Sequence, residues 1–274
     1  MPLLMTWTAS TSLPVESDAL RPDVIAGRSA EEVAGLPARV GKETVPLGDL
    51  FRIEGEGGDG HLILEGDLAH VRRIGAGMAS GRLTIRGDVG PHLGAEMLGG
   101  TIELTGAASS WAGAEMRGGL IRIRGAAGDA LGAAYPGSRR GMRDGEILVE
   151  GPVGRDAGLA MRRGLIAVSG PASDGLGRGM IAGSILAFGR VGRLVGAGMK
   201  RGTIALFDPG PSFEPSPTFA ASGSFAMPVL TILLRHLLDR GFPVPAGLEG
   251  ASVSRYNGDL LDRGQGEILC LEAD

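Results

Sequence analysis

The stretch GDVGPHLGAEMLGGTIELTG, residues 87–106, holds one complete unit of a repeat that recurs along the chain. Its glycines stand at 87, 90, 94, 99, 100 and 106, and an aliphatic pair, Ile102 and Leu104, follows Gly100. Residues two apart in a strand share a face, so this pair points inward together. The unit therefore predicts a short strand between glycine-rich turns.

Methionines recur at 19-residue spacing outward from Met97, with one step of 26 residues between Met116 and Met142. A glycine follows three residues after each methionine and begins an alternating triplet. The seven methionines are Met78, Met97, Met116, Met142, Met161, Met180 and Met199. A fixed period of this length is typical of stacked identical units. A column of methionines is one way to bind a soft metal. Because no cysteine or histidine recurs beside them as a further ligand, we interpret the methionines as core residues.

The expected fold is all-β: a right-handed parallel β-helix of about eight coils with a 19-residue repeat. A degenerate first coil carries Leu62 and Leu64, 21 residues before Leu83 and Ile85. At about 4.8 Å per strand the stack is roughly 35 Å long, and right-handed crossovers are the default for parallel strands. The expected division is an N-terminal flank at 1–57, the glycine-rich β-helix at 58–207, and a C-terminal helix and tail at 208–274. The helix, around residues 228–240, is expected to cover the open end of the β-helix.

Composition narrows the classes of function. Glycine makes up 49 of 274 residues and 43% of the chain is hydrophobic, so the chain is neither fibrous nor disordered. A net charge of −4 gives no reason to expect nucleic acid. A lone cysteine, no signal peptide and no apolar run long enough for a bilayer predict a cytoplasmic protein without membrane contact. The four histidines form no metal-binding pair, so we expect no metal, no cofactor and no catalytic site in this chain.

Two departures from the repeat mark candidate contact residues. Seven extra residues between Gly132 and Met142 form an insertion that carries Tyr135, Arg139 and Arg140. Insertions in repeat proteins map to one face, and aromatic and arginine side chains are enriched at interfaces. A basic column also follows the methionines, at Arg117, Arg143, Arg162, Arg163, Lys200 and Arg201. A plain surface loop and a solvated charged edge remain open alternatives.

Two segments resemble a known family. The run LGAAYPGSRRGMRDGEILVEGPVGRDAGLAMRRGLIAVSG, residues 131–170, and the tail RYNGDLLDRGQGEIL, residues 255–269, resemble the C subunit of formylmethanofuran dehydrogenase. The resemblance covers about residues 20–270. The same repeat is shared with the C-terminal domain of glutamate synthase, but 274 residues leave no room for that enzyme's other domains.

The resemblance implies a non-catalytic structural subunit. One possibility is the C subunit of the bacterial formyltransferase/hydrolase complex, which uses a methanofuran-like carrier and tetrahydromethanopterin. Its partners are then a formyltransferase subunit and hydrolase-like subunits. The other is the C subunit of a molybdenum or tungsten formylmethanofuran dehydrogenase. The expected contact residues toward a partner or the carrier's anionic tail are Tyr135, Arg139, Arg140, Arg143, Arg162, Arg163, Lys200 and Arg201.

Overall fold

The computed structural model describes residues 2–211, 213–248 and 250–272, and in these residues the protein is predominantly β with few helices. The N-terminal elements are β1 (Leu3–Trp7), β2 (Val15–Glu16), α1 (Pro22–Ile25), α2 (Ala30–Ala34), β3 (Pro37–Val40), β4 (Glu43–Pro46), β5 (Phe51–Glu54), β6 (His61–Glu65) and β7 (Val71–Arg72). The repeats contribute β8 (Arg82–Arg86), β9 (Thr101–Leu104), β10 (Arg117–Ile123), β11 (Asp144–Val149), β12 (Leu165–Val168), β13 (Ser184–Ala187) and β14 (Arg201–Leu206). The C-terminal elements are β15 (Ala220–Ala226), α3 (Pro228–Asp239), β16 (Ser252–Gly258) and β17 (Gln265–Leu271). Three short 3₁₀ turns, η1 (Leu47–Asp49), η2 (Gly57–Asp59) and η3 (Leu260–Asp262), complete the described elements.

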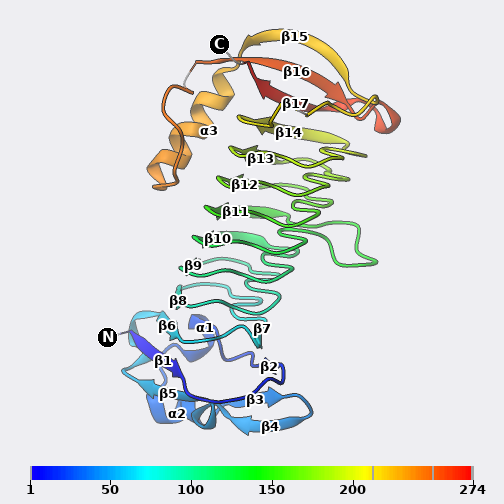
Figure 1. Cartoon of the computed structure of the whole chain (residues 1–274). Helices are drawn as coiled ribbons and strands as arrows, with labels where there is room; N and C mark the ends of the chain where they lie inside the picture. The colour runs from blue at the N-terminus through cyan, green and yellow to red at the C-terminus, as the bar shows by residue number, and fades with distance from the viewer. Residues whose placement is uncertain (1, 212, 249, 273–274) are drawn as a thin grey trace.

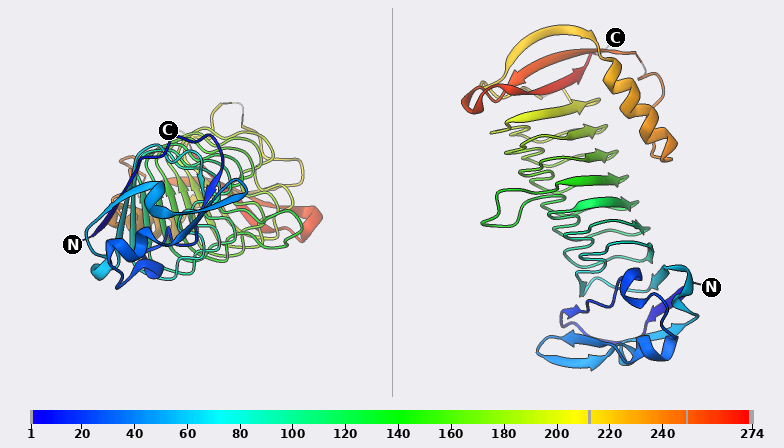
Figure 2. Two further views of the ribbon diagram at one scale, coloured as in Figure 1. Left: turned by 90° about the horizontal axis from the view of Figure 1, so that it is seen from below. Right: turned by 180° about the vertical axis from the view of Figure 1, so that it is seen from behind.

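One large mixed sheet runs the length of the molecule (Figure 1). In the described residues it has thirteen strands, in the order β15-β16-β17-β14-β13-β12-β11-β10-β9-β8-β6-β1-β5. From β6 to β14 neighbouring strands are parallel, and each aliphatic pair lies in register with the pair one repeat away, as Ile102 does with Ile121. The degenerate first repeat takes its predicted place, because Leu62 pairs with Leu83. Viewed along the stack, the repeats lie one behind another (Figure 2).

A second parallel ladder of isolated bridges runs beside this sheet. It joins Leu68, Val89, Ala108, Ala127, Val153, Ala172 and Val191 in succession. The seven methionines of the repeats lie in the core with no exposed surface, which confirms their interpretation as core residues. Two rows of backbone pairing per repeat, with apolar side chains between them, hold each repeat against its neighbours.

The ladder continues past the repeats at both ends. At the C-terminal end β17 pairs in parallel with β14, and Ile268 lies beside Ile204. At the N-terminal end β1 pairs in parallel with β6, and Leu3 lies beside Leu62. Sequence reasoning missed both strands, although QGEILC repeats the glycine and alternating apolar pattern of the coils.

The N-terminal part adds a small sheet of its own. In the described residues this sheet has four strands, in the order β4-β3-β2-β7. Helix α2 begins with a capping box, because the Ser29 side chain accepts from the Glu32 amide while the Glu32 carboxylate accepts from the Ser29 amide. These hydrogen bonds, the backbone bond first, lower the pKa of Glu32.

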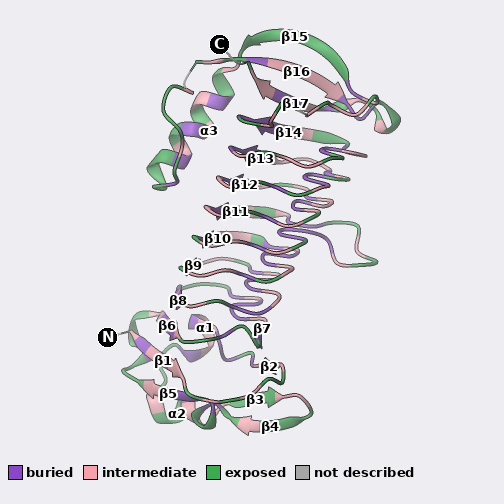
Figure 3. Ribbon diagram, viewed as in Figure 1, coloured by how far each residue is buried: buried purple, intermediate pink, exposed green. Residues whose placement is uncertain are grey.

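The C-terminal helix forms where predicted but lies elsewhere than expected. Its buried residues, Leu230, Leu234 and Leu237, pack against Leu148, Leu165, Ala167, Leu186 and Ala205 on the outward face of the repeat strands. The helix thus covers the flank of the sheet, and β15, β16 and β17 lie at its end (Figure 1). The physical reason is that outward positions turn apolar from β11 onward, so the flank rather than the end needs a cover. In Figure 3 buried and exposed residues both occur along α3, in keeping with a helix covered on one side only.

No helix in the described ranges is long and apolar enough to cross a membrane.

Candidate functional site

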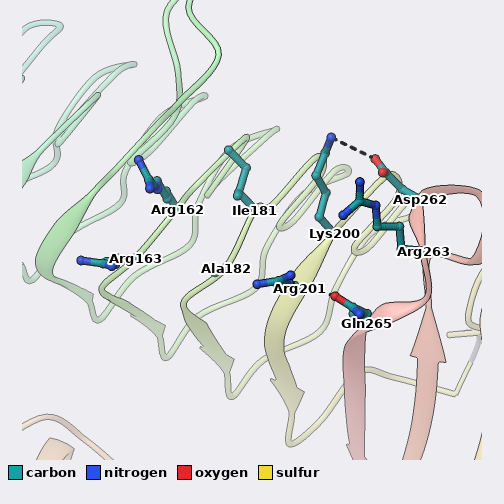
Figure 4. Close-up of a pocket in the computed structure, with 9 residues that line it drawn as sticks. All are labelled: Arg162, Arg163, Ile181, Ala182, Lys200, Arg201, Asp262, Arg263 and Gln265. Carbon is teal, nitrogen blue, oxygen red and sulfur yellow. Dashed lines mark hydrogen bonds and ion pairs between the residues drawn. The ribbon is translucent and has the colours of Figure 1, made fainter.

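Basic side chains gather along the edge of the stack where strands β12 to β14 begin. Arg162 and Arg163 follow the buried Met161, and Lys200 and Arg201 follow Met199. These side chains form two rows (Figure 4). One row runs from Arg162 past Ile181 to Lys200, and the other runs from Arg163 past Ala182 to Arg201. A hollow of about 420 Å³ lies here, lined by Arg162, Arg163, Ile181, Ala182, Lys200, Arg201, Asp262, Arg263 and Gln265. The 19-residue spacing therefore places the two charged pairs on one edge of the stack, separated by one uncharged repeat.

The insertion brings two further arginines to the same place. A second hollow, of about 520 Å³, is lined by Arg139, Arg140, Arg162, Gly179, Ile181 and Lys200. It shares Arg162, Ile181 and Lys200 with the first hollow. We call the joint feature the basic surface and define it as Arg139, Arg140, Arg162, Arg163, Lys200, Arg201 and Arg263. Sequence reasoning missed Arg263, since nothing in the tail's spacing indicates that β17 lies beside β14.

Little negative charge compensates this surface. Lys200 Nζ lies 3.5 Å from Asp262 Oδ2, and Arg201 Nε donates to Gln265 Oε1 over 2.9 Å. For its other five members, the described part of the chain provides no ion pair with a carboxylate. Because these cations line one edge of the stack, their fields add along the edge and favour an anionic partner.

Arg143 lies outside the basic surface. Its guanidinium is 3.5 Å from Glu115 Oε2, and one repeat earlier Arg117 is 3.9 Å from Glu96 Oε2. Glu96 and Glu115 stack beside the arginines of the following repeats and neutralise them. The predicted basic column therefore divides into two parts. Arg117 and Arg143 pair with glutamates of the preceding repeats, whereas from Arg162 onward the described residues give only Lys200 a carboxylate partner, Asp262.

Tyr135 also lies apart from the basic surface. Its hydroxyl is 2.8 Å from His92 Nδ1, and its ring stacks on Trp111 with centroids 5.0 Å apart. Beneath the rings lie Ala76, Ala95 and Ala114. Its backbone amide donates to Glu115 Oε1 over 3.2 Å. Tyr135 thus fastens the start of the insertion to the two preceding repeats.

The protonation of this aromatic cluster follows from its burial. Burial, and then the charges of Arg73 and Arg72, lower the pKa of His92. Burial also raises the pKa of the Tyr135 phenol. A neutral imidazole and a protonated phenol are both compatible with this hydrogen bond, whose donor is set by the imidazole tautomer. A signal existed in the sequence, because Arg73, His92 and Trp111 are 19 residues apart and share one repeat position.

Possible metal ligands and the free thiol are the alternative sites to the basic surface. Among the residues that the structure describes, no cluster of three or more His, Cys, Asp or Glu side chains could hold a metal ion. The Cys270 thiol is half-buried, and burial raises its pKa to about 11. At neutral pH it is therefore protonated and a poor nucleophile. The feature best built for recognition is the basic surface.

Comparison with known proteins gives the chain its relatives. The model of the GXGXG motif family matches residues 65–217. A chain of the formyltransferase/hydrolase complex (FhcABCD) from Methylorubrum extorquens, crystallised with methylofuran, superimposes with a TM-score of 0.90 and 32% identity. That match covers 98% of this chain and 100% of the other.

Curated relatives match over a shorter stretch. The C subunit of the tungsten-containing formylmethanofuran dehydrogenase 2 of Methanothermobacter wolfeii is 38% identical over 91 residues, which are 32% of this chain and 34% of that protein. The C subunit of the molybdenum-containing formylmethanofuran dehydrogenase 1 of Methanosarcina barkeri is 38% identical over 85 residues, 30% of this chain and 28% of that protein. The matched stretch is thus about a third of each relative's length or less. The family model, which matches more than half of the chain, the similarity to the C subunits and the full-length structural match together show that the chain belongs to the GXGXG motif family, among the homologues of the C subunit of formylmethanofuran dehydrogenase.

Proposed function

We propose that this chain is the structural, non-catalytic subunit of a formyltransferase/hydrolase complex in tetrahydromethanopterin- and methanofuran-linked one-carbon metabolism. There it docks the formyltransferase subunit, beside hydrolase-like subunits, in the cytoplasm. One observation carries the proposal: the 32% identity and TM-score of 0.90 to a chain of the Methylorubrum extorquens complex extend over 98% of this chain. A match of that extent includes the flanks as well as the widely shared repeat.

The proposed architecture is a right-handed parallel β-helix flanked by the regions 1–57 and 208–274. Parallel pairing at 19-residue spacing and the second ladder of bridges support it. A stack held by two ladders is rigid and presents fixed side chains on its surface. Such a body suits a docking role, while the carriers, a methanofuran-like molecule and tetrahydromethanopterin, serve the other members of the complex.

A second candidate is the C subunit of a molybdenum or tungsten formylmethanofuran dehydrogenase. The 38% identity to the two formylmethanofuran dehydrogenase C subunits favours this assignment within the matched stretch. Because that identity extends over about a third of those proteins, the full-length match makes the formyltransferase/hydrolase complex the stronger assignment.

Within the complex we assign contact with a partner or the carrier's anionic tail to Tyr135, Arg139, Arg140, Arg143, Arg162, Arg163, Lys200 and Arg201. Six of these eight line the two joined hollows. Tyr135 and Arg143 lie outside these hollows and also hold the base of the insertion against the preceding repeats.

Affinity purification of the tagged chain from its own host, with mass spectrometry and metal analysis of the eluate, tests the assignment. We expect a formyltransferase and a zinc-bearing hydrolase-like polypeptide, without molybdenum or tungsten. Iron–sulfur and pterin-bound molybdenum or tungsten partners would move the assignment to the dehydrogenase. A chain that elutes alone would end the proposal of a subunit role.

Charge reversal tests the contact residues. Arg139→Glu with Arg140→Glu should weaken assembly or raise the KM for the carrier, because two cations of the basic surface become anions. The matched control is Arg124→Glu with Arg155→Glu, which changes net charge equally at exposed arginines outside the basic surface. Equal assembly and equal KM for both double variants would remove the insertion from the proposed contact.

A further inference from the structure

Two leucines protrude from the molecule beside the basic surface. They belong to η3, and their exposed fractions are 58% for Leu260 and 86% for Leu261. The residues that follow directly, Asp262 and Arg263, line the hollow of the basic surface. The tip therefore lies at the rim of the basic surface.

The backbone of this tip is held firmly. The buried Asp259 side chain accepts from the Leu261 amide through Oδ1 and from the Gly198 amide through Oδ2, each over 2.9 Å. The Leu260 amide donates to the Thr218 carbonyl, and the Gly264 amide donates to the Asp259 carbonyl. Burial alone would raise the pKa of Asp259, but the hydrogen bonds it accepts outweigh burial and lower the pKa. The leucines are thus presented in a fixed position by an ionised anchor.

The side chains around Leu260 and Leu261 indicate what kind of surface would cover these leucines. Ile181 lies between Arg162 and Lys200 in the basic row, so apolar and cationic side chains alternate across the surface (Figure 4). A small anion could neutralise the arginines but would leave the leucines in water. A protein surface with an apolar recess and an acidic rim would bury the leucines and pair with the cations at the same time, as interfaces with an apolar centre and a charged rim do.

We propose that Leu260 and Leu261 insert into an apolar recess, rimmed by carboxylates, on a partner protein. The inference rests on the proposed function and deepens it, because it makes the occupant of the basic surface a protein rather than a free carrier. The fixed tip then acts as the apolar anchor, and the cations of the basic surface steer the partner toward it.

Single substitutions in the native complex test the anchor. Leu261→Asp should lower partner affinity at least about tenfold, because a carboxylate is forced into an apolar, acid-rimmed recess. The matched control is Leu13→Asp in the N-terminal region, where the leucine is 53% exposed. Native mass spectrometry of complexes purified from the host shows which subunits are present, and thermal unfolding of each isolated variant confirms that it folds. Full partner recovery with Leu261→Asp would overturn the proposal.

A cross-link identifies the occupant directly. With Leu261→p-benzoylphenylalanine in the complex, illumination should join the tip to a partner peptide that contains apolar residues flanked by Asp or Glu. Absence of any cross-link to another polypeptide, or a peptide flanked by Lys or Arg, would overturn the inference. This outcome is separate from the proposed function, which is decided by the identity of the polypeptides that purify with the unmodified chain.

Discussion

At the scale of single residues, methionine and glycine fit together across repeats. A β-carbon on Gly164 would lie 2.7 Å from Met142 Cε and 2.6 Å from the Gly145 carbonyl oxygen, and Gly164 has a φ of +97°. The same contact recurs between Met78 and Gly100, and between Met199 and Gly266 in β17. The thioether methyl thus fills the space that the missing side chain leaves. This shared fit explains why the two residue types recur with the same period.

Gly164→Ala should therefore be more destabilising than an alanine at a glycine with open surroundings. Gly137 is the matched control, because its φ is +86° and an added β-carbon there would meet no heavy atom within 4 Å. Gly137→Ala should cost about 1–2 kcal/mol for its left-handed backbone, and Gly164→Ala about 1–3 kcal/mol more for overpacking. Denaturant unfolding measures both free energies. Equal losses would contradict the role of the methionine contact.

The titration of His92 yields a second prediction at this scale. Its folded-state pKa lies below the ordinary value of about 6.5, so the unfolded chain takes up a proton that the folded protein resists. The stability owed to neutral His92 is complete above about pH 6.5 and declines as the pH falls from there toward the folded pKa. The free energy of unfolding should thus fall more steeply between about pH 7.5 and 5 in the wild type than in His92→Gln. Parallel curves would show that burial of His92 carries no such cost.

At the scale of elements, helix α3 is held against the sheet by charge as well as by apolar contact. The Arg122 guanidinium donates to the carbonyls of Arg240 and Gly241, just beyond the helix end, and pairs with Glu150 at 3.1 Å. Glu146 lies 2.8 Å from His236 and 3.3 Å from Arg240. The polar contacts thus fix where on the apolar flank the helix lies.

Arg122→Met should loosen the C-terminal end of α3 while leaving the repeats folded. The loss of charged donors to helix-end carbonyls is expected to cost about 1.5–3 kcal/mol. Arg124→Met, two residues along the chain and exposed, is the control. Hydrogen exchange of residues 228–242 should speed up in the first variant alone. Equal exchange in both would show that the leucine contacts hold the helix unaided.

At the scale of the whole molecule, the two ends and one flank are closed by chain outside the repeats. Strand β17 covers the edge of β14, and α3 covers the apolar flank of β11 to β14. Unpaired strand edges and uncovered apolar faces are sites of aggregation. The C-terminal region therefore keeps the stack discrete, and the edge of the sheet passes to β15.

Removal of residues 208–274 should produce oligomers or aggregates in light scattering after size exclusion, because both the β14 edge and the flank become exposed. A full-length Leu234→Asp variant separates the two causes, since it disturbs α3 and leaves β17 paired. We expect it to lose stability yet remain monomeric. A monomeric truncated chain would contradict the role of β17.

The sequence alone determined the repeat, the strands, the methionine core, the degenerate first coil and the site of α3 along the chain. The repeat features depend on contacts at fixed spacing, so a period of 19 residues reveals them. The position of α3 follows instead from its local pattern, an apolar stretch between Pro228 and Gly241. Tertiary structure decided the rest. It placed β1 and β17 on the ends of the ladder, laid α3 on the flank, turned Tyr135 toward His92 and Trp111, and brought Arg139 and Arg263 to one surface. The physical reason is that these contacts join segments outside the repeat, whose separation along the chain carries no period.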